Sequence, residues 1–251
     1  MSSAYLNAIL AREAVDTSAF SPVRQVQTII APVLQQWANR FLLSISPSGS
    51  FAKGTANRSG TDIDLFISLH EDTPETLKDI YGSLFNAIAG AGYVPKRQNA
   101  SINATIGGFD VDLVPGKRQS AWTTDHSLYR RTADTWTKTN VTTHINTVVM
   151  AGHQRESRLL KLWRNQKRLE FPSFYLELTV IAALSGRTSP DLAENVVTVL
   201  EYLRDKFTAA RVIDPANGNN VISDDLTGTE KQAVRRLAEA ALGGNWSGFV
   251  Q

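Results

Sequence analysis

The chain has 251 residues, of which 42% are hydrophobic and 20% charged, and its formal net charge is +2. This composition is typical of a folded globular protein with room for one large domain or two small ones. The small basic excess does not by itself indicate nucleic-acid binding. The absence of cysteine excludes disulfides and thiolate metal sites, and the four histidines lack the i,i+4 pairing that favours a zinc site.

No segment predicts export or insertion into a membrane. The N-terminal stretch MSSAYLNAILAREAVD lacks a basic start followed by a long apolar run. The most apolar stretch, FYLELTVIAALSG, is too short to span a bilayer and contains Glu177. We therefore expect a cytoplasmic protein that makes no membrane contact.

The first predicted element is a helix over residues 22–39, where apolar side chains recur at helical spacing. Pro32 lies inside it, which leaves open whether this is one kinked helix or two short ones. Short β-rich runs predict strands over residues 41–46 and 62–69. A second helix is expected over residues 73–92, which open with a threonine cap and a proline and close on glycine.

The later elements change in character from strands to helices. Residues 101–116 predict a β-hairpin, because two β-rich runs flank the favoured two-residue turn Gly-Gly. From about Val141 the expected elements are helices, over residues 142–168, 172–185, 190–208 and 228–242. The organisation is therefore α+β, with a sheet-containing domain in residues 1–140 and an all-helical domain in residues 141–251. The N-terminal helix is a candidate to pack on the helical half.

Aspartates interrupt two otherwise apolar strands. Asp62 and Asp64 alternate at the head of DIDLFISL, so both project to one side of the strand, about 7 Å apart. Carboxylates this close repel each other and lose hydration unless a cation lies between them, and Mg²⁺ prefers such oxygen ligands. The strand FDVDLV offers a third carboxylate, Asp110 or Asp112, with which two metal ions could act in phosphoryl transfer.

A Gly-Ser pair precedes the first two aspartates. Gly49 lets the backbone approach a ligand closely, and Ser50 offers an N–H and a hydroxyl to a phosphate. Lys53 and Thr55 are further candidate donors. Taken singly, alternating aspartates are often a solvated strand face and a Gly-Ser loop is often only a turn. Their combination, followed by a later strand aspartate, is much more specific.

In this order, GSFAKGTANRSGTDIDL and DVDLVP resemble the signature of the DNA polymerase β-like nucleotidyltransferase superfamily. The form Gly-Ser-Phe-x-x-Gly-Thr looks most like the oligoadenylate synthetases and the bacterial cyclic-oligonucleotide synthases, and archaeal CCA-adding enzymes are also similar. The resemblance implies a mixed-sheet nucleotidyltransferase domain followed by a helical nucleotide-binding domain. It also implies Asp62, Asp64 and Asp112 as catalytic, metal-binding residues, because the third aspartate of these families lies three residues before a proline. Asp110 is the weaker candidate.

The stretch ESRLLKLWRNQKRLEFPSFYLELTVIAAL is similar to two consecutive helices of the synthetases. The resemblance implies that Lys161 holds the donor triphosphate and that Ser173 binds a phosphate oxygen. Phe174 would stack on the base in the synthetase-like register, and Tyr175 in the CCA-adding register. A helix N-terminus after Pro172 is also an anion site, and an aromatic ring there offers a flat face to a base. Burial in the core is the alternative for both rings.

The activity that the resemblance implies is metal-dependent nucleotidyl transfer. NTPs or dNTPs would be joined into short linear or cyclic oligonucleotides by in-line attack on the α-phosphate, with release of pyrophosphate. Two Mg²⁺ ions are expected, for which Mn²⁺ can substitute. The product would be a signal in bacterial defence, read by an effector protein.

Other functions stay open at this stage. Addition of nucleotides to an RNA 3′ end needs an extended basic surface for the acceptor, which the net charge does not indicate. A nucleic-acid acceptor nevertheless remains open, as does transfer of a nucleotide to a protein side chain. A non-catalytic binding module is disfavoured because all three carboxylates are present.

Overall fold

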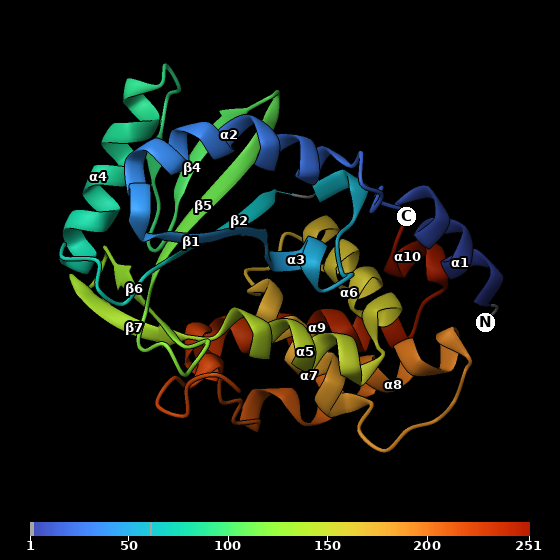
Figure 1. The fold of residues 1–251 in the computed structure, drawn as a ribbon. Helices are drawn as coiled ribbons and strands as arrows, with labels where there is room; N and C mark the ends of the chain where they lie inside the picture. The colour runs from blue at the N-terminus through green and yellow to red at the C-terminus, as the bar shows by residue number, and fades with distance from the viewer. Residues whose placement is uncertain (1–2, 61) are drawn as a thin grey trace. The chain divides into compact units, whose positions relative to one another are not determined.

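The computed structural model describes residues 3–60 and 62–251 (Figure 1). Thr61, which precedes the predicted Asp-x-Asp pair, lies outside the described residues. The chain divides into two compact units. The first, here called the sheet unit, comprises residues 16–52 and 61–145. The second, the helical unit, comprises residues 1–15, 53–60 and 146–251.

The sheet unit is built on a seven-stranded mixed sheet. Its central strands, β2 (Ile63–Leu69) and β5 (Phe109–Arg118), are parallel. The main path runs β1-β2-β5-β4-β3, and β6 and β7 continue from the far part of β5. The other strands are β1 (Leu42–Pro47), β3 (Lys96–Arg97), β4 (Ile102–Ile106), β6 (His126–Arg130) and β7 (Thr135–Thr139).

This sheet confirms the predicted α+β class. Strands lie where residues 41–46 and 62–69 predict them, and β4 and β5 form the expected hairpin. Its two turn residues, Gly107 and Gly108, have φ of 59° and 84°, the left-handed conformation that a two-residue hairpin turn requires. β6 and β7 were not predicted, because their mixed polar sequences lack a clear apolar alternation.

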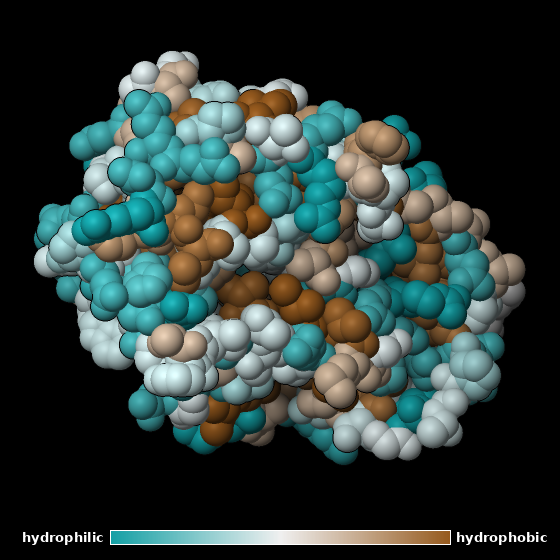
Figure 2. Space-filling model, in the orientation of Figure 1, coloured by the Kyte–Doolittle hydropathy of each residue, from teal (hydrophilic) through white to brown (hydrophobic). Residues whose placement is uncertain are grey.

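Two helices lie on one side of the sheet (Figure 1). α2 (Pro22–Ala38) continues through Pro32 as a single helix, and α4 (Leu77–Gly90) packs beside it. α4 begins later than predicted, because Thr76 is its cap and accepts a hydrogen bond from the N–H of Asp79. The hydroxyl of Thr73, the predicted cap, instead donates to a backbone oxygen in the preceding loop. The outer surface over α4 is mainly hydrophilic (Figure 2).

Successive side chains of β2 point alternately to the two sides of the sheet. Ile63, Leu65 and Ile67 enter a hydrophobic core that α2 and α4 complete. Asp64, Phe66 and Ser68 therefore project to the opposite side, here called the carboxylate face. The apolar side of the sheet forms the core, and the carboxylate face is available for a functional site.

The helical unit has a hydrophobic core of its own. Its first helix, α1 (Ser3–Arg12), was not predicted, and it contributes Leu6, Ile9 and Leu10 to this core. α1 packs against α6 (Gln154–Gln166) and α8 (Leu192–Asp205). The hydroxyl of Tyr5 donates to the carbonyl of Val250, so the two ends of the chain lie close together in this unit (Figure 1). The other helices are α7 (Ser173–Ala183), α9 (Gly228–Leu242) and α10 (Trp246–Phe249).

Two sequence predictions differ from the structure in this half of the chain. The single helix predicted over residues 142–168 is wrong: it is two helices, α5 (Val141–Ala151) and α6, interrupted at Gly152, where φ is 74°. The helix predicted over residues 22–39 is α2 and belongs to the sheet unit, so α1 is the N-terminal helix in the helical core.

The predicted domain boundary between residues 140 and 141 lies close to the division at residue 145 but does not account for the short segment 53–60. The assignment of residues 1–140 and 141–251 as domains therefore stays a prediction. None of the described helices is both long and apolar enough to cross a membrane.

Candidate active site

The three predicted catalytic aspartates all belong to the sheet unit, and the register of β2 and β5 brings two of them together. Asp64 pairs directly with Asp112 across the parallel ladder. Asp62 immediately precedes β2 and shares the side of Asp64, as Asp110 shares that of Asp112. Four carboxylates thus gather on the carboxylate face at one end of β2 and β5.

A buried asparagine that the sequence analysis missed completes this cluster. Asn103 of β4 pairs with Asp112, and its side-chain nitrogen donates to Asp112 Oδ1 at 2.9 Å and to Asp110 Oδ1 at 2.6 Å. One amide therefore orients two carboxylates. The available signal was an asparagine in the apolar run INATI, directly before the hairpin turn that folds it back onto DVDL.

The electrostatics of the cluster follow from crowding and partial burial. Burial raises the pKa of Asp62, and the charge of Asp110 raises it further. Burial also raises the pKa of Asp112, against the lowering effect of the Asn103 hydrogen bond, and the charges of Asp62 and Asp110 add to the rise. The cluster thus holds more negative charge than its own hydrogen bonds compensate.

The donor set fits a hard dication, because it consists of carboxylate oxygens that repel one another until a cation neutralises them. Within residues 3–60 and 62–251, however, no three or more His, Asp or Glu side chains form a group already arranged to hold a metal ion. The assignment of Asp62, Asp64 and Asp112 as ligands of two Mg²⁺ ions therefore stays a prediction.

The predicted Gly-Ser loop lies directly against the cluster. It is a short helix, α3 (Gly49–Ala52), and not an irregular loop. Gly49 has φ of 55°, and a Cβ on it would overlap the carboxylate of Asp64. The N–H of Ser48 donates to the backbone oxygen of Asp64 at 2.9 Å, and Ser50 is partly exposed in α3. Glycine is thus required here to admit the carboxylate of Asp64, in addition to its predicted role in approaching a phosphate.

The predicted triphosphate ligand, Lys161, lies in the helical unit on α6 and is only 5% exposed. Its Nζ contacts Glu177 Oε1 at 2.5 Å and Thr55 Oγ1 at 2.9 Å. Lys53 Nζ contacts the other oxygen of Glu177 at 2.5 Å. Lys53 and Thr55, which the sequence suggested as phosphate donors, are therefore engaged with a buried glutamate that the sequence analysis did not single out.

This buried network holds two ammonium groups and one carboxylate. Burial lowers the pKa of Lys161 to about 8, although Glu177 acts to raise it. Burial acts to raise the pKa of Glu177, but the charges of Lys161 and Lys53 bring it below its ordinary value. The network carries an excess of positive charge while Lys161 is protonated, which suits an anionic ligand.

The remaining predicted residues open α7 in the helical unit. Ser173 accepts a hydrogen bond from Arg164 Nη1 at 2.9 Å, so an arginine lies at this helix N-terminus. Tyr175 is 0% exposed and packs edge-on against Phe171. Its buried ring has no face left for a base, and we correct the prediction that it stacks. Phe174 is partly buried, with Lys53 Nζ 4.9 Å from its ring centroid, and it remains the candidate for stacking.

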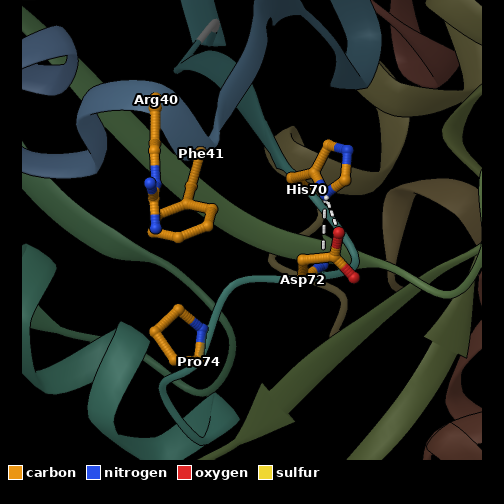
Figure 3. A pocket seen from close by; sticks show the side chains of 5 residues that line it. All are labelled: Arg40, Phe41, His70, Asp72 and Pro74. Atoms are coloured by element: carbon orange, nitrogen blue, oxygen red, sulfur yellow. Dashed lines mark hydrogen bonds and ion pairs between the residues drawn. The ribbon is translucent and has the colours of Figure 1, made fainter.

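A hollow at the other end of β2 contains none of the predicted residues (Figure 3). Arg40 lies over the ring of Phe41, and His70 faces Asp72, with 3.5 Å between His70 Nδ1 and a carboxylate oxygen of Asp72. This hollow follows the last residue of β2, whereas Asp62 precedes the first. It therefore does not belong to the carboxylate cluster.

The region that carries the carboxylate cluster is similar to a known domain family. Residues 30–119, which include all four aspartates, match the nucleotidyltransferase domain family. The chain therefore contains a region that matches nucleotidyltransferase domains, and this region carries the whole carboxylate cluster.

Individual relatives include enzymes with different products. The cyclic AMP-AMP-AMP synthase of Escherichia coli MS 115-1 is 24% identical, over 84% of this chain and 78% of that protein. The structure of CdnC from E. coli MS115-1 with ATP superposes with a TM-score of 0.73 at 21% identity, over 96% of this chain and 85% of that one. The Cid1 poly(U) polymerase superposes with a TM-score of 0.69 at 12% identity, over 99% and 98%. At these identities the structures show a shared fold.

Proposed function

We propose that this protein joins NTPs or dNTPs into short oligonucleotides, linear or cyclic, and that the product acts as a signal in bacterial defence. The observation that carries the proposal is the pairing of Asp64 with Asp112 on adjacent parallel strands, with Asp62 on the same side. Similarity to a cyclic AMP-AMP-AMP synthase supports the product class. An effector protein that recognises the product is the partner that such a role requires, and a cytoplasmic location fits it.

In the proposed reaction an acceptor hydroxyl attacks the α-phosphorus of the donor. The new bond joins the acceptor oxygen to this phosphorus, the bond to the bridging oxygen of the β-phosphate breaks, and pyrophosphate leaves. Asp112 is the proposed acceptor of the hydroxyl proton, because a carboxylate beside the reacting hydroxyl can act as a general base. Mg²⁺ held by Asp62, Asp64 and Asp112 would supply Lewis-acid stabilisation of the charge that develops on the phosphate oxygens.

The protein residues divide the remaining tasks. Asn103 fixes the carboxylate of Asp112 in place, and Gly49 leaves room for that of Asp64. In the helical unit, Lys161 and Ser173 are the proposed ligands of the donor phosphates, and Phe174 is the proposed stacking partner of a base. Ser50 is a further proposed phosphate ligand, from α3.

The second candidate is template-independent addition of nucleotides to an RNA 3′ end. The likeness to the Cid1 poly(U) polymerase favours it, because the fold matches over nearly the whole of both chains. Nucleotide transfer to a protein side chain remains a third possibility that the site chemistry allows.

One experiment separates these activities. Purified protein is incubated with Mg²⁺ or Mn²⁺ and each of the four NTPs and four dNTPs, labelled at the α-phosphate, without any nucleic acid. We expect pyrophosphate and new oligonucleotide species. Product that forms only after RNA is supplied would move the assignment to RNA-end addition, and label on a protein would move it to protein modification.

A further inference from the structure

Another cavity, apart from the hollow in Figure 3, lies on the carboxylate face. It is farther along β2 than the carboxylate cluster. It has a volume of about 440 Å³, within the range of small-molecule sites, and belongs entirely to the sheet unit. β1 contributes Ser46 and Pro47, and β2 contributes Phe66 and Ser68. Phe66 and Ser68 are two and four residues from Asp64 on the same side, about 7 and 13 Å along the strand.

The polar floor of this cavity is a buried pair, Ser68 and His126, each 7% exposed. His126 Nδ1 lies 2.9 Å from the carbonyl oxygen of Thr124, so this nitrogen must carry a proton. Ser68 Oγ lies 2.7 Å from Nε2, the other ring nitrogen. In the neutral imidazole Nε2 is an acceptor, and the hydroxyl of Ser68 therefore donates to it.

The environment of His126 favours the neutral form. Burial lowers its pKa, and the charge of Arg118 lowers it further, against the effects of the Thr124 carbonyl and the Asp125 carboxylate. Because the hydroxyl proton of Ser68 is donated to His126, Ser68 Oγ can act toward a ligand only as a hydrogen-bond acceptor. It suits a ligand that carries an N–H donor.

The cavity has no excess charge with which to hold a phosphate. Arg118, which lines it, forms an ion pair with Glu71, with Nη2 2.7 Å from the carboxylate. The remaining lining consists of hydroxyls and apolar surface, including Thr123, Val141 and Ile145. Such walls fit an uncharged, flat group better than an anion.

A loop that lines the cavity also carries an exposed tryptophan. Trp122 is 94% exposed and directly precedes Thr123 and Thr124, which line the cavity. The side chain of Asn140 donates to Thr124 Oγ1 at 2.9 Å and to Asp125 Oδ1 at 2.7 Å, which anchors this loop. A large, exposed aromatic ring on an anchored loop that lines a neutral cavity is suited to stacking on a nucleobase.

We propose that this cavity binds the base of the acceptor nucleotide, that Ser68 accepts a hydrogen bond from an exocyclic amino group of that base, and that Trp122 stacks on the base. This inference rests on the proposed nucleotidyl transfer. A nucleoside bound in this way extends its ribose along the carboxylate face toward Asp64 and Asp112, where the attacking hydroxyl is needed.

The test uses the full chain and nucleoside monophosphates, which can accept a nucleotide but have no pyrophosphate to release as donors. With a labelled donor NTP held constant, AMP and CMP should be better acceptors than UMP, whose base has no exocyclic amino group. Trp122→Ala and Ser68→Ala should each raise the KM for AMP at least tenfold while the KM for the donor NTP stays unchanged. The exposed Trp136 of β7, which does not line the cavity, supplies the control Trp136→Ala.

Unchanged KM for AMP in Trp122→Ala would overturn the proposal, and this exposed position poses no risk to folding. A direct titration distinguishes failure of the cavity from failure of the proposed function. Adenosine should quench tryptophan fluorescence in the wild type and much less in Trp122→Phe, even in a protein that releases no pyrophosphate. Equal quenching in both proteins, or none in either, would contradict base binding at Trp122.

Discussion

At the scale of single residues, the crowded carboxylates of the cluster lower the stability of the folded protein at neutral pH. Asp112 is partly buried beside Asp62 and Asp110, which raises its pKa. In the folded state it therefore binds a proton more tightly than in the unfolded chain. Stability is lost as the pH rises from the ordinary value of 3.8 through the raised pKa, and the cost is fully present at neutral pH.

The first prediction concerns Asp112→Asn. The amide keeps an acceptor for Asn103 and removes the repelling charge, so without metal the variant should have a higher Tm than the wild type at pH 7. This gain should shrink as the pH approaches 3.8. Nucleotidyl transfer should fall about 100-fold or more, because the proposed metal ligand and proton acceptor is lost. Calorimetry with and without Mg²⁺ tests this, and Mg²⁺ should raise the Tm of the wild type more than that of the variant.

A result in which Asp112→Asn lowers the Tm at pH 7 would show that the Asp112 charge stabilises the fold, contrary to the direction of its pKa shift. Near-normal turnover would remove Asp112 from the catalytic machinery.

The second prediction concerns Lys161, whose pKa burial lowers to about 8. Glu177 acts to raise this pKa, and Lys53 and Arg164 act to lower it further. If Lys161 binds the donor triphosphate as we propose, its charge is present below pH 8 and lost above it. The KM for the donor NTP should then rise by up to about tenfold per pH unit above 8. Above its pKa, the fraction of protein in which a single group is still protonated falls about tenfold per pH unit.

The matched variant is Lys161→Arg, since a guanidinium stays protonated throughout this range. Its pH profile for the donor KM should be flat between pH 8 and 10. Parallel profiles for the wild type and Lys161→Arg would assign the pH dependence to another group.

At the scale of elements, the turn from β1 into α3 requires a particular residue type because of its position beside the carboxylate cluster. Gly49 adopts a left-handed φ, and any side chain there would meet the carboxylate of Asp64. We predict that Gly49→Ala lowers activity about 100-fold, because it displaces Asp64, a proposed metal ligand, and that it also destabilises the fold by more than backbone strain alone.

Gly92→Ala is the control for this prediction. Gly92 also has a positive φ, 88°, but a Cβ there meets nothing within 4 Å. It should cost about 1 kcal/mol through backbone strain, with activity retained. Chemical denaturation and turnover measured on both variants separate strain from displacement of Asp64. Equal activities in the two variants would contradict the proposed contact.

The elements also show what the sequence could and could not predict. Period-2 alternation around Asp62 and Asp64, and the Gly-Gly turn, were sufficient for β2, β4 and β5, and hence for the side shared by the aspartates. Asn103 and Glu177 were missed because a single polar residue in an apolar run reveals its partner only when the tertiary pairing is known. Tyr175 was misassigned for the converse reason: adjacent Phe174 and Tyr175 are equivalent aromatic residues until packing buries one of them.

The break between α5 and α6 illustrates a weaker kind of signal. Gly152 stands in a long helical pattern, and an isolated glycine is often tolerated there. Only its positive φ, which the fold imposes, identifies it as the end of a helix.

At the scale of the whole molecule, the chain builds two hydrophobic cores from segments that are not contiguous. α1 belongs to the helical core, whereas α2, the next helix, belongs to the core of the sheet unit. The helical unit therefore needs the N-terminus of the chain, which contributes fully buried Leu6 beside α6 and α8. We expect this dependence to appear as a local loss of stability.

The last prediction is that Leu6→Ala destabilises the helical unit by about 2–5 kcal/mol, the usual cost of a cavity in a well-packed core. Amide hydrogen exchange should lose protection in α1, α6 and α8, while β2 and β5 in the other core retain theirs. Leu84→Ala, at a fully buried position of α4 in the sheet unit, should give the reverse pattern. If either variant lowers protection equally in both cores, the chain unfolds as one cooperative unit and its two cores are not separable in energy.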